Sequence, residues 1–200
     1  MPPERIAGVL LAAGLSSRMG RNKLLLEIAG RTVVRRAAEK ALSAGLSPLL
    51  VVVGHEREKV EAALLGLPLR AVFNPDYASG MNSSLRAGIA AVPDDCAGAL
   101  VLLADMPLVT AGMLGELRDT FRRKGTPLVI STYGGIVAPP TLYGRALFPE
   151  LRELSGEACG KRVVKQHRAE AAEIAWPPAA LADLDLPADV ERVRATFEEA

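Results

Sequence analysis

A loop of small and cationic residues follows the first apolar run of the chain. Residues 13–23 have the sequence AGLSSRMGRNK and include Arg18 and Lys23. Glycine and serine let backbone N–H groups approach a phosphate closely, and the two cations add positive charge where a polyphosphate would lie. The loop has neither the GxxxxGKS/T nor the GxGxxG pattern, which argues against a Walker A loop and against a dinucleotide-binding dehydrogenase. The pattern favours phosphate binding over its alternative, a surface loop with two solvated cations.

An aspartate stands close to the end of another apolar run. Asp105 follows Ala99–Leu103 after a single intervening residue. A carboxylate at the carboxyl end of a buried strand is well placed for magnesium, which takes oxygen ligands from one or two carboxylates and from substrate phosphates. Transfer of a phosphorus-centred group needs this alignment and charge neutralisation more than covalent help from the protein. The alternative is a turn or helix N-cap residue before Pro107, and the residues alone leave both interpretations open.

These side chains must be positioned by elements that alternate along the chain. Continuous apolar runs separated by helix-like spacing predict an α/β fold with a mostly parallel sheet and helices on both faces. Beyond Tyr133 the alternation weakens, and Gly134, Gly135, Pro139 and Pro140 predict an irregular stretch. The expected strands are Ile6–Ala12, Leu49–Val53, Leu69–Phe73, Ala99–Leu103 and Leu128–Ser131, and the expected helices are Thr32–Ala44, Glu56–Leu65, Ser83–Ala91, Thr110–Arg123, Arg162–His167 and Val190–Phe197.

The polar loops of such a fold should meet in one place. Ligands of open parallel sheets bind beyond the carboxyl ends of the strands. This rule gathers residues 14–23, 54–55, 74–84 and 105–107 around a single cleft. Within the third of these segments, Ser83 is expected to cap the following helix.

Length and composition narrow the class of protein. The 200 residues fit one domain, residues 1–200, and the formal net charge of +1 argues against nucleic acid or a membrane surface as a partner. Cys96 and Cys159 are too few for a disulfide framework. The apolar run near the N-terminus is too short for a signal peptide or a membrane span, so we expect a cytoplasmic protein.

Three segments resemble the signature blocks of one enzyme family. LAAGLSSRMGRNK at residues 11–23 resembles LAAGxSxRMGxxK of the MobA-like nucleotidyltransferases. NPDYASGMNSS at 74–84 and LLADMPLVT at 102–110 are similar to two further blocks of that family. The resemblance implies a three-layer α/β/α sandwich with a mostly parallel, mixed sheet, the Rossmann-like nucleotidyltransferase fold. It also implies an enzyme similar to the molybdenum cofactor cytidylyltransferases, which transfer CMP from CTP to the phosphate of molybdopterin and release pyrophosphate.

The resemblance assigns roles to individual positions. It implies that Asp105 binds the metal, Mg²⁺ or alternatively Mn²⁺, and acts in catalysis with Arg18 and Lys23, which hold the triphosphate. DLDLPAD at 183–189 is similar to the C-terminal metal block of the family, so Asp185 is expected as the partner of Asp105, with Asp183 as the second choice. The nucleotide-binding residues by the same resemblance are Leu11, Ala12, Ala13, Gly14, Arg18, Lys23, Asn74, Gly80 and Ser84.

The acceptor half of the chain departs from the family pattern. Pro139 stands where the family has a histidine of a Gly-His-Pro motif. This leaves a GTP-dependent enzyme, an enzyme for another phosphorylated acceptor, or a non-catalytic nucleotide-binding protein as alternatives to a molybdopterin cytidylyltransferase. LAAG at residues 11–14, rather than the LAGG of guanylyltransferases, favours CTP by resemblance. The presence of Lys23 and Asp105 argues against a protein that only binds nucleotide.

Overall fold

The computed structural model describes residues 5–16, 19–156, 158–184 and 187–198. Their main feature is a seven-stranded sheet with the order β5-β4-β1-β6-β8-β7-β9. One strand, β8, runs antiparallel to both of its neighbours, and the remaining pairs are parallel. The strands are β1 (Arg5–Ala12), β4 (Leu49–Val53), β5 (Arg70–Phe73), β6 (Cys96–Leu103), β7 (Leu128–Tyr133), β8 (Ile136–Gly144) and β9 (Ala172–Trp176).

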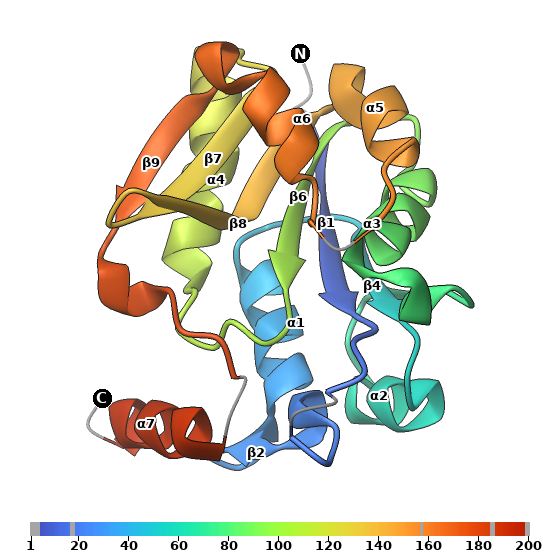
Figure 1. Ribbon diagram of the computed structural model, residues 1–200, viewed down its shortest axis with the longest axis vertical. Coiled ribbons are helices and arrows are strands. Elements are labelled where there is room, and N and C mark those ends of the chain that lie inside the picture. The colour runs from blue at the N-terminus through green and yellow to red at the C-terminus, as the bar shows by residue number, and fades with distance from the viewer. Residues whose placement is uncertain (1–4, 17–18, 157, 185–186, 199–200) are drawn as a thin grey trace.

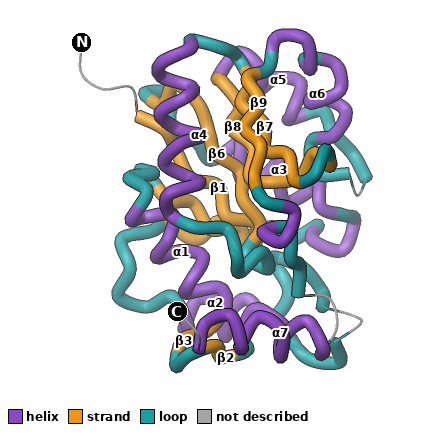
Figure 2. Tube along the Cα trace, turned by 90° about the vertical axis from the view of Figure 1, so that its left-hand side faces the viewer, coloured by secondary structure: helices purple, strands orange, loops and turns teal. Residues whose placement is uncertain are grey.

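Helices cover both faces of this sheet and make three layers. Figure 2 shows α1 and α4 on one side of the strands and α3, α5 and α6 on the other. Two apolar cores result, because successive side chains of β1 and β6 point to opposite faces and are buried on both. The predicted α/β fold with helices on both faces is confirmed. The helices are α1 (Val33–Ser43), α2 (Arg57–Ala63), α3 (Met81–Ala90), α4 (Ala111–Lys124), α5 (Phe148–Arg152), α6 (Lys161–Gln166) and α7 (Pro187–Glu198).

The last helix lies against a small hairpin outside the sheet. Figures 1 and 2 show α7 beside the hairpin of β2 (Glu27–Ile28) and β3 (Arg31–Thr32), at the same end of the molecule as α2. Arg194 of α7 donates to the carbonyl oxygen of Glu27 at 3.3 Å. None of the helices in the described part of the chain is long and apolar enough to cross a membrane.

The expectation of an irregular stretch beyond Tyr133 is wrong, because Ile136–Gly144 forms β8 in the middle of the sheet. The β7–β8 register shifts just before Ser131, which leaves Pro139 and Pro140 without a paired residue in β7. Proline has no N–H to donate, so a bulge accommodates it. The two proline carbonyls still accept hydrogen bonds from the hydroxyls of Tyr133 and Ser131, at 3.0 and 2.7 Å.

The start of α3 also differs from the prediction. Gly80, with a φ of +108°, occupies the N-cap position, and the helix begins at Met81. Ser83 lies inside the first turn, where its hydroxyl donates to the carbonyl oxygens of Gly80 and Asp76 at 2.8 and 2.9 Å. Ser83 is therefore not the cap.

Thr110 is the N-cap of α4, since its Oγ1 accepts the backbone N–H of Met113 at 3.2 Å. We expect Thr110→Ala to lower the free energy of unfolding by about 1 kcal/mol, the usual value of a lost cap. Urea denaturation measures the difference, and Thr110→Ser, which keeps the hydroxyl, is the matched control. Equal midpoints for Thr110→Ala and the wild type would contradict the assignment. Because Thr110 caps α4, the N-cap interpretation of Asp105 does not hold.

Candidate active site

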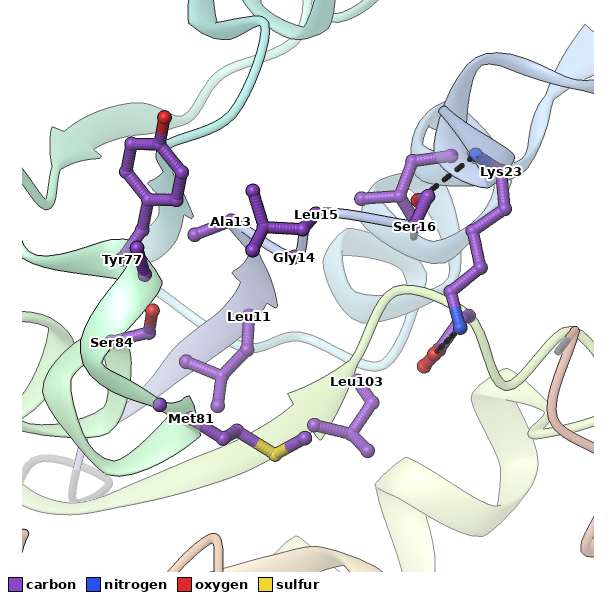
Figure 3. A pocket seen from close by; sticks show the side chains of 14 residues that line it. Leu11, Ala13, Gly14, Leu15, Ser16, Lys23, Tyr77, Met81, Ser84 and Leu103 are labelled. Atoms are coloured by element: carbon purple, nitrogen blue, oxygen red, sulfur yellow. Dashed lines mark hydrogen bonds and ion pairs between the residues drawn. The ribbon is translucent and has the colours of Figure 1, made fainter. Parts of the chain in front are cut away.

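A pocket of about 290 Å³ lies at the carboxyl ends of β1 and β6. The loop after β1 forms one side, and the segment between β5 and α3 forms the other, so that Lys23 and Tyr77 face the pocket from opposite sides (Figure 3). This is the edge of the sheet where the polar loops were predicted to meet. The lining residues are Leu11, Ala13, Gly14, Leu15, Ser16, Lys23, Leu24, Tyr77, Ala78, Gly80, Met81, Ser84, Leu103 and Asp105.

The loop after β1 folds back on itself through Ser16. Ser16 has a φ of +52°, and its hydroxyl oxygen accepts the backbone N–H of Lys23 at 3.1 Å. The N–H of Met19 donates to the Ser16 carbonyl at 3.0 Å. This fold brings the start of the Lys23 side chain back to the pocket, as Figure 3 shows. Arg18, the other predicted phosphate ligand, lies outside the described residues.

Lys23 and Asp105 form an ion pair inside the pocket. The Lys23 Nζ lies 2.6 Å from the Asp105 Oδ2, and the two side chains are 13% and 20% exposed. The predicted phosphate ligand and the predicted metal ligand thus meet, although they come from different loops. Both charges are partly withdrawn from water, where a charged ligand interacts with them more strongly than at an open surface.

Three hydrogen bonds hold the loop that carries Asp105. The N–H of Ala104 donates to the Leu11 carbonyl of β1 at 3.1 Å, and the Nζ of Lys40 in α1 donates to the Pro107 carbonyl at 2.5 Å. The N–H of Leu184 donates to the carbonyl of Asp105 itself at 3.2 Å. The last bond brings the C-terminal acidic segment alongside Asp105.

The structure places only part of that acidic segment. Residues 181–184 form no strand, so the predicted strand alternation does not hold there. Asp183 is exposed, and Asp185 lies outside the described residues. Burial raises the pKa of Tyr133 to about 12, and the negative charge of Asp183 adds to the rise. Asp183 is therefore near the phenol of Tyr133 as well as the Asp105 loop.

On the opposite side of the pocket, Asn74 holds the segment between β5 and α3. Its buried amide donates to the hydroxyls of Ser83 and Ser84 at 2.8 and 3.0 Å, and its oxygen accepts the N–H of Asp76 at 3.0 Å. Asn74 does not line the pocket, whereas Ser84 and Gly80 do. The Asn74 amide therefore holds Ser84 in position without itself lining the pocket.

Tyr77 also lines the pocket and was not predicted from the sequence. Its ring lies 6.3 Å, centroid to centroid, from that of His55. Gly54 passes so close that an added Cβ would lie 2.6 Å from the Tyr77 Cβ, which explains why glycine stands there. An aromatic residue in a loop beyond a strand end was the available signal.

Residues 11–14, which were predicted to bind the nucleotide, have side chains on both faces of the sheet. Leu11, Ala13 and Gly14 line the pocket. The side chain of Ala12 packs instead in the apolar core beneath α1 and α4. Ala13 is the position at which the LAAG and LAGG patterns differ, and its methyl group faces the pocket side.

The sequence model of a protein family, the MobA-like NTP transferase domain, matches residues 8–171 of this chain. The chain belongs to this family. The match covers the glycine loop, Asp105, most of β1 and the sheet strands from β4 to β8, whereas β9 lies outside it. The family prediction made from the three sequence blocks is confirmed.

Relatives and solved structures show how far the likeness extends. The bifunctional protein GlmU of Sorangium cellulosum is 34% identical over 84% of this chain, but that match spans only 36% of GlmU. Nicotine blue oxidoreductase of Paenarthrobacter nicotinovorans is 42% identical over 58% of this chain and 57% of its own length. The crystal structure of Rv0371c from Mycobacterium tuberculosis superimposes with a TM-score of 0.85 at 28% identity, over 96% of this chain and 99% of that one. A manganese complex of Rv0371c has also been solved.

Proposed function

We propose that this protein transfers a nucleoside monophosphate from a nucleoside triphosphate to a phosphorylated small molecule. The observation that carries the proposal is the ion pair between Lys23 and Asp105 in the pocket beyond β1 and β6. One group of the pair suits a polyphosphate and the other suits a divalent cation. Membership of the MobA-like NTP transferase family supports the same reaction type.

The described residues suit a magnesium or manganese ion that takes some of its ligands from phosphate and water. They do not suit a metal bound by protein side chains alone. Among the residues that the structure describes, no group of three or more His, Cys, Asp or Glu side chains gathers. Magnesium needs only one or two carboxylates, because phosphate oxygens and water complete its shell. Asp105 would hold it with a carboxylate of the 183–185 segment. The manganese complex of Rv0371c supports a divalent cation, without indicating its ligands in this chain. When bound, the ion would neutralise charge on the phosphate oxygens.

The chain's own groups would divide the work of the transfer. An oxygen of the acceptor phosphate attacks the α-phosphorus, and the bond from that phosphorus to its bridging oxygen breaks, so that pyrophosphate leaves with the electron pair. Lys23 would exchange its pairing with Asp105 for the leaving pyrophosphate, and Arg18 would share this role. The backbone at residues 11–14 and the Gly80–Ser84 turn hold the nucleoside.

We assign CTP as the preferred nucleotide and molybdopterin as the first acceptor to test. The methyl group of Ala13 takes up space in the pocket at a position where enzymes with the LAGG pattern have only a hydrogen atom. Pro139 replaces the family histidine, so another phosphorylated acceptor, or GTP as donor, is the alternative.

In direct competition, wild-type protein is expected to use CTP in preference to GTP. Ala13→Gly should reduce that preference by about fourfold, because one buried methyl group is worth about 0.8 kcal/mol. Mass spectrometry of the nucleotidylated product from an equimolar mixture measures the ratio. Ala7→Gly, at a buried position of β1 outside the segment 11–14, is the control that should leave the ratio unchanged. A guanine preference in the wild type would overturn the CTP assignment and leave the reaction class intact.

A thermal-shift series tests the reaction class before any acceptor is known. CTP, GTP, ATP and NAD are each added with and without magnesium, and only binding to the folded state raises the Tm. A magnesium-dependent rise with a triphosphate and none with NAD is the expected result. A rise with NAD alone would favour redox chemistry, such as that in the name of the nicotine blue relative, and would contradict nucleotidyl transfer.

A further inference from the structure

A second pocket, of about 380 Å³, lies between the first half of β8 and helix α6. Val137, Pro139 and Thr141 of β8 and Val164 of α6 supply a mainly apolar wall. Its rim is cationic, and no aspartate or glutamate lines it among the described residues. A pocket with an apolar body and charge of one sign at its edge suits a ligand with the complementary pattern.

This pocket opens at the same edge of the sheet as the first one. Because β8 runs antiparallel to β6, the first residues of β8 lie beside the carboxyl end of β6, with Val101 paired to Thr141. Asp105 follows that end of β6. Both pockets also lie on the α3 side of the sheet, since Leu11 and Val164 belong to the core on that face.

The buried residue Asn82, at the start of α3, holds Ser155, Gly156 and Gly160 between α5 and α6. The N–H of Asn82 donates to the Gly156 carbonyl at 3.0 Å, its amide donates to the Ser155 carbonyl at 2.7 Å, and its oxygen accepts the N–H of Gly160 at 3.0 Å. Met81, the residue before Asn82, lines the first pocket and reaches toward Leu103 (Figure 3). Asn82, next to the lining of the first pocket, is thus connected with Gly160, which follows Cys159 of the second pocket.

Cys159 lies close enough to Asp105 for the charge of the carboxylate to act on its thiol. Its side chain lines the second pocket. Burial raises the pKa of Cys159 to about 12, and the Asp105 carboxylate adds to the rise through its charge. A molecule that fills the second pocket would extend toward Asp105, because the first residues of β8 lie beside the end of β6 that precedes Asp105.

The cations of the rim have few carboxylate partners. Lys161 and Lys165 are exposed one helical turn apart, where like charges repel. No ion pair joins either lysine to another described residue, and Arg168 pairs with Glu173. An anion placed between the lysines would relieve their repulsion.

We propose that this second pocket holds the acceptor, and that the acceptor carries a second acidic group, bound by Lys161, Lys165 and Arg168, besides the phosphate that reacts at Asp105. The inference rests on the proposed nucleotidyl transfer. The acceptor has an apolar or aromatic middle, because Pro139 and its neighbours offer a wall with little to hydrogen-bond. Lys161 and Lys165 then determine specificity without taking part in the chemical step.

Two matched probes test the requirement for a second acidic group. Benzyl phosphate and 4-carboxybenzyl phosphate differ only in one carboxylate, and calorimetry with the full-length protein and magnesium measures their Kd values. We expect the carboxylated probe to bind about five- to tenfold tighter, as for exposed charge pairs. The advantage should shrink at 0.5 M salt.

Variants locate the effect at the second pocket. Lys161→Ala/Lys165→Ala should remove the advantage of the carboxylated probe, whereas Lys124→Ala, an exposed lysine at the end of α4, should keep it. Equal Kd values for the two probes on the wild type, no binding of either, or an advantage that survives loss of both lysines would overturn the proposal. Thermal shift by CTP and magnesium on the same samples separates the two claims. A normal shift leaves nucleotidyl transfer standing when the probes fail, and a missing shift counts against nucleotidyl transfer itself.

Discussion

Asp105→Asn is expected to remain folded and to lose turnover by about a hundred- to a thousandfold, the usual loss of one fixed charge in a transfer site. The amide keeps the shape of the side chain and removes the charge that would hold the metal. Thr110, not Asp105, caps α4, so the substitution removes no helix cap. The pair with Lys23 is partly exposed, and its loss should cost no more than about 1 kcal/mol of stability.

Pyrophosphate release at saturating nucleotide, with urea unfolding in parallel, measures both parts of this prediction. Asp189→Asn is the matched control, because Asp189 lies in the first turn of α7 and pairs with Arg192 at 2.8 Å; it should keep near wild-type turnover. Asp185→Asn, whose position lies outside the described residues, is expected to resemble Asp105→Asn. Near wild-type turnover in Asp105→Asn would show that Asp105 takes no part in the reaction.

Lys23→Ala should have two opposite effects. Loss of the cation that faces the leaving pyrophosphate should lower kcat/KM by about ten- to a thousandfold, since a charge-assisted contact is worth about 1.5–3 kcal/mol or somewhat more. In the absence of nucleotide, however, Mn²⁺ should bind the variant more tightly, by up to about fivefold. Lys23 competes for the Asp105 carboxylate in the empty pocket, and a partly exposed ion pair contributes up to about 1 kcal/mol.

Electron paramagnetic resonance of free Mn²⁺ gives the binding curve, and steady-state kinetics gives kcat/KM. Lys124→Ala, remote from the pocket, should change neither. Arg18→Ala is expected to lower kcat/KM in the same range as Lys23→Ala. Unchanged kinetics in both variants would mean that the loop does not hold the triphosphate. Weaker Mn²⁺ binding by Lys23→Ala would contradict the competition.

The nucleotide half of the fold could be predicted because its strands are continuous apolar runs. Leu49–Val53 is buried at every position, and such runs identify parallel strands without knowledge of their partners. β8 could not be predicted in this way, because Pro139 and Pro140 normally end a strand. They are tolerated only where the β7–β8 register shifts, and that shift depends on the neighbouring strand.

The same limit applies to the site. Glycines, cations and an aspartate after strand ends predicted that Lys23, Gly80, Ser84 and Asp105 would share a pocket. The ion pair between Lys23 and Asp105 depends on the hydrogen bond from the Lys23 N–H to the Ser16 hydroxyl, which folds the loop. Residue spacing alone does not predict that bond. Asn74 was predicted to bind the nucleotide, but it does not line the pocket, and its hydrogen bonds to Ser83 and Ser84 depend on packing that the sequence does not show.

The most direct test of nucleotidyl transfer at this pocket is the chelator dependence of pyrophosphate release. Protein, CTP, molybdopterin and magnesium are incubated together, and pyrophosphate and the nucleotidylated product are quantified in the same sample. We predict equimolar pyrophosphate and product, with both abolished by excess EDTA and restored by magnesium or manganese. Release that continues undiminished in excess chelator would contradict the account.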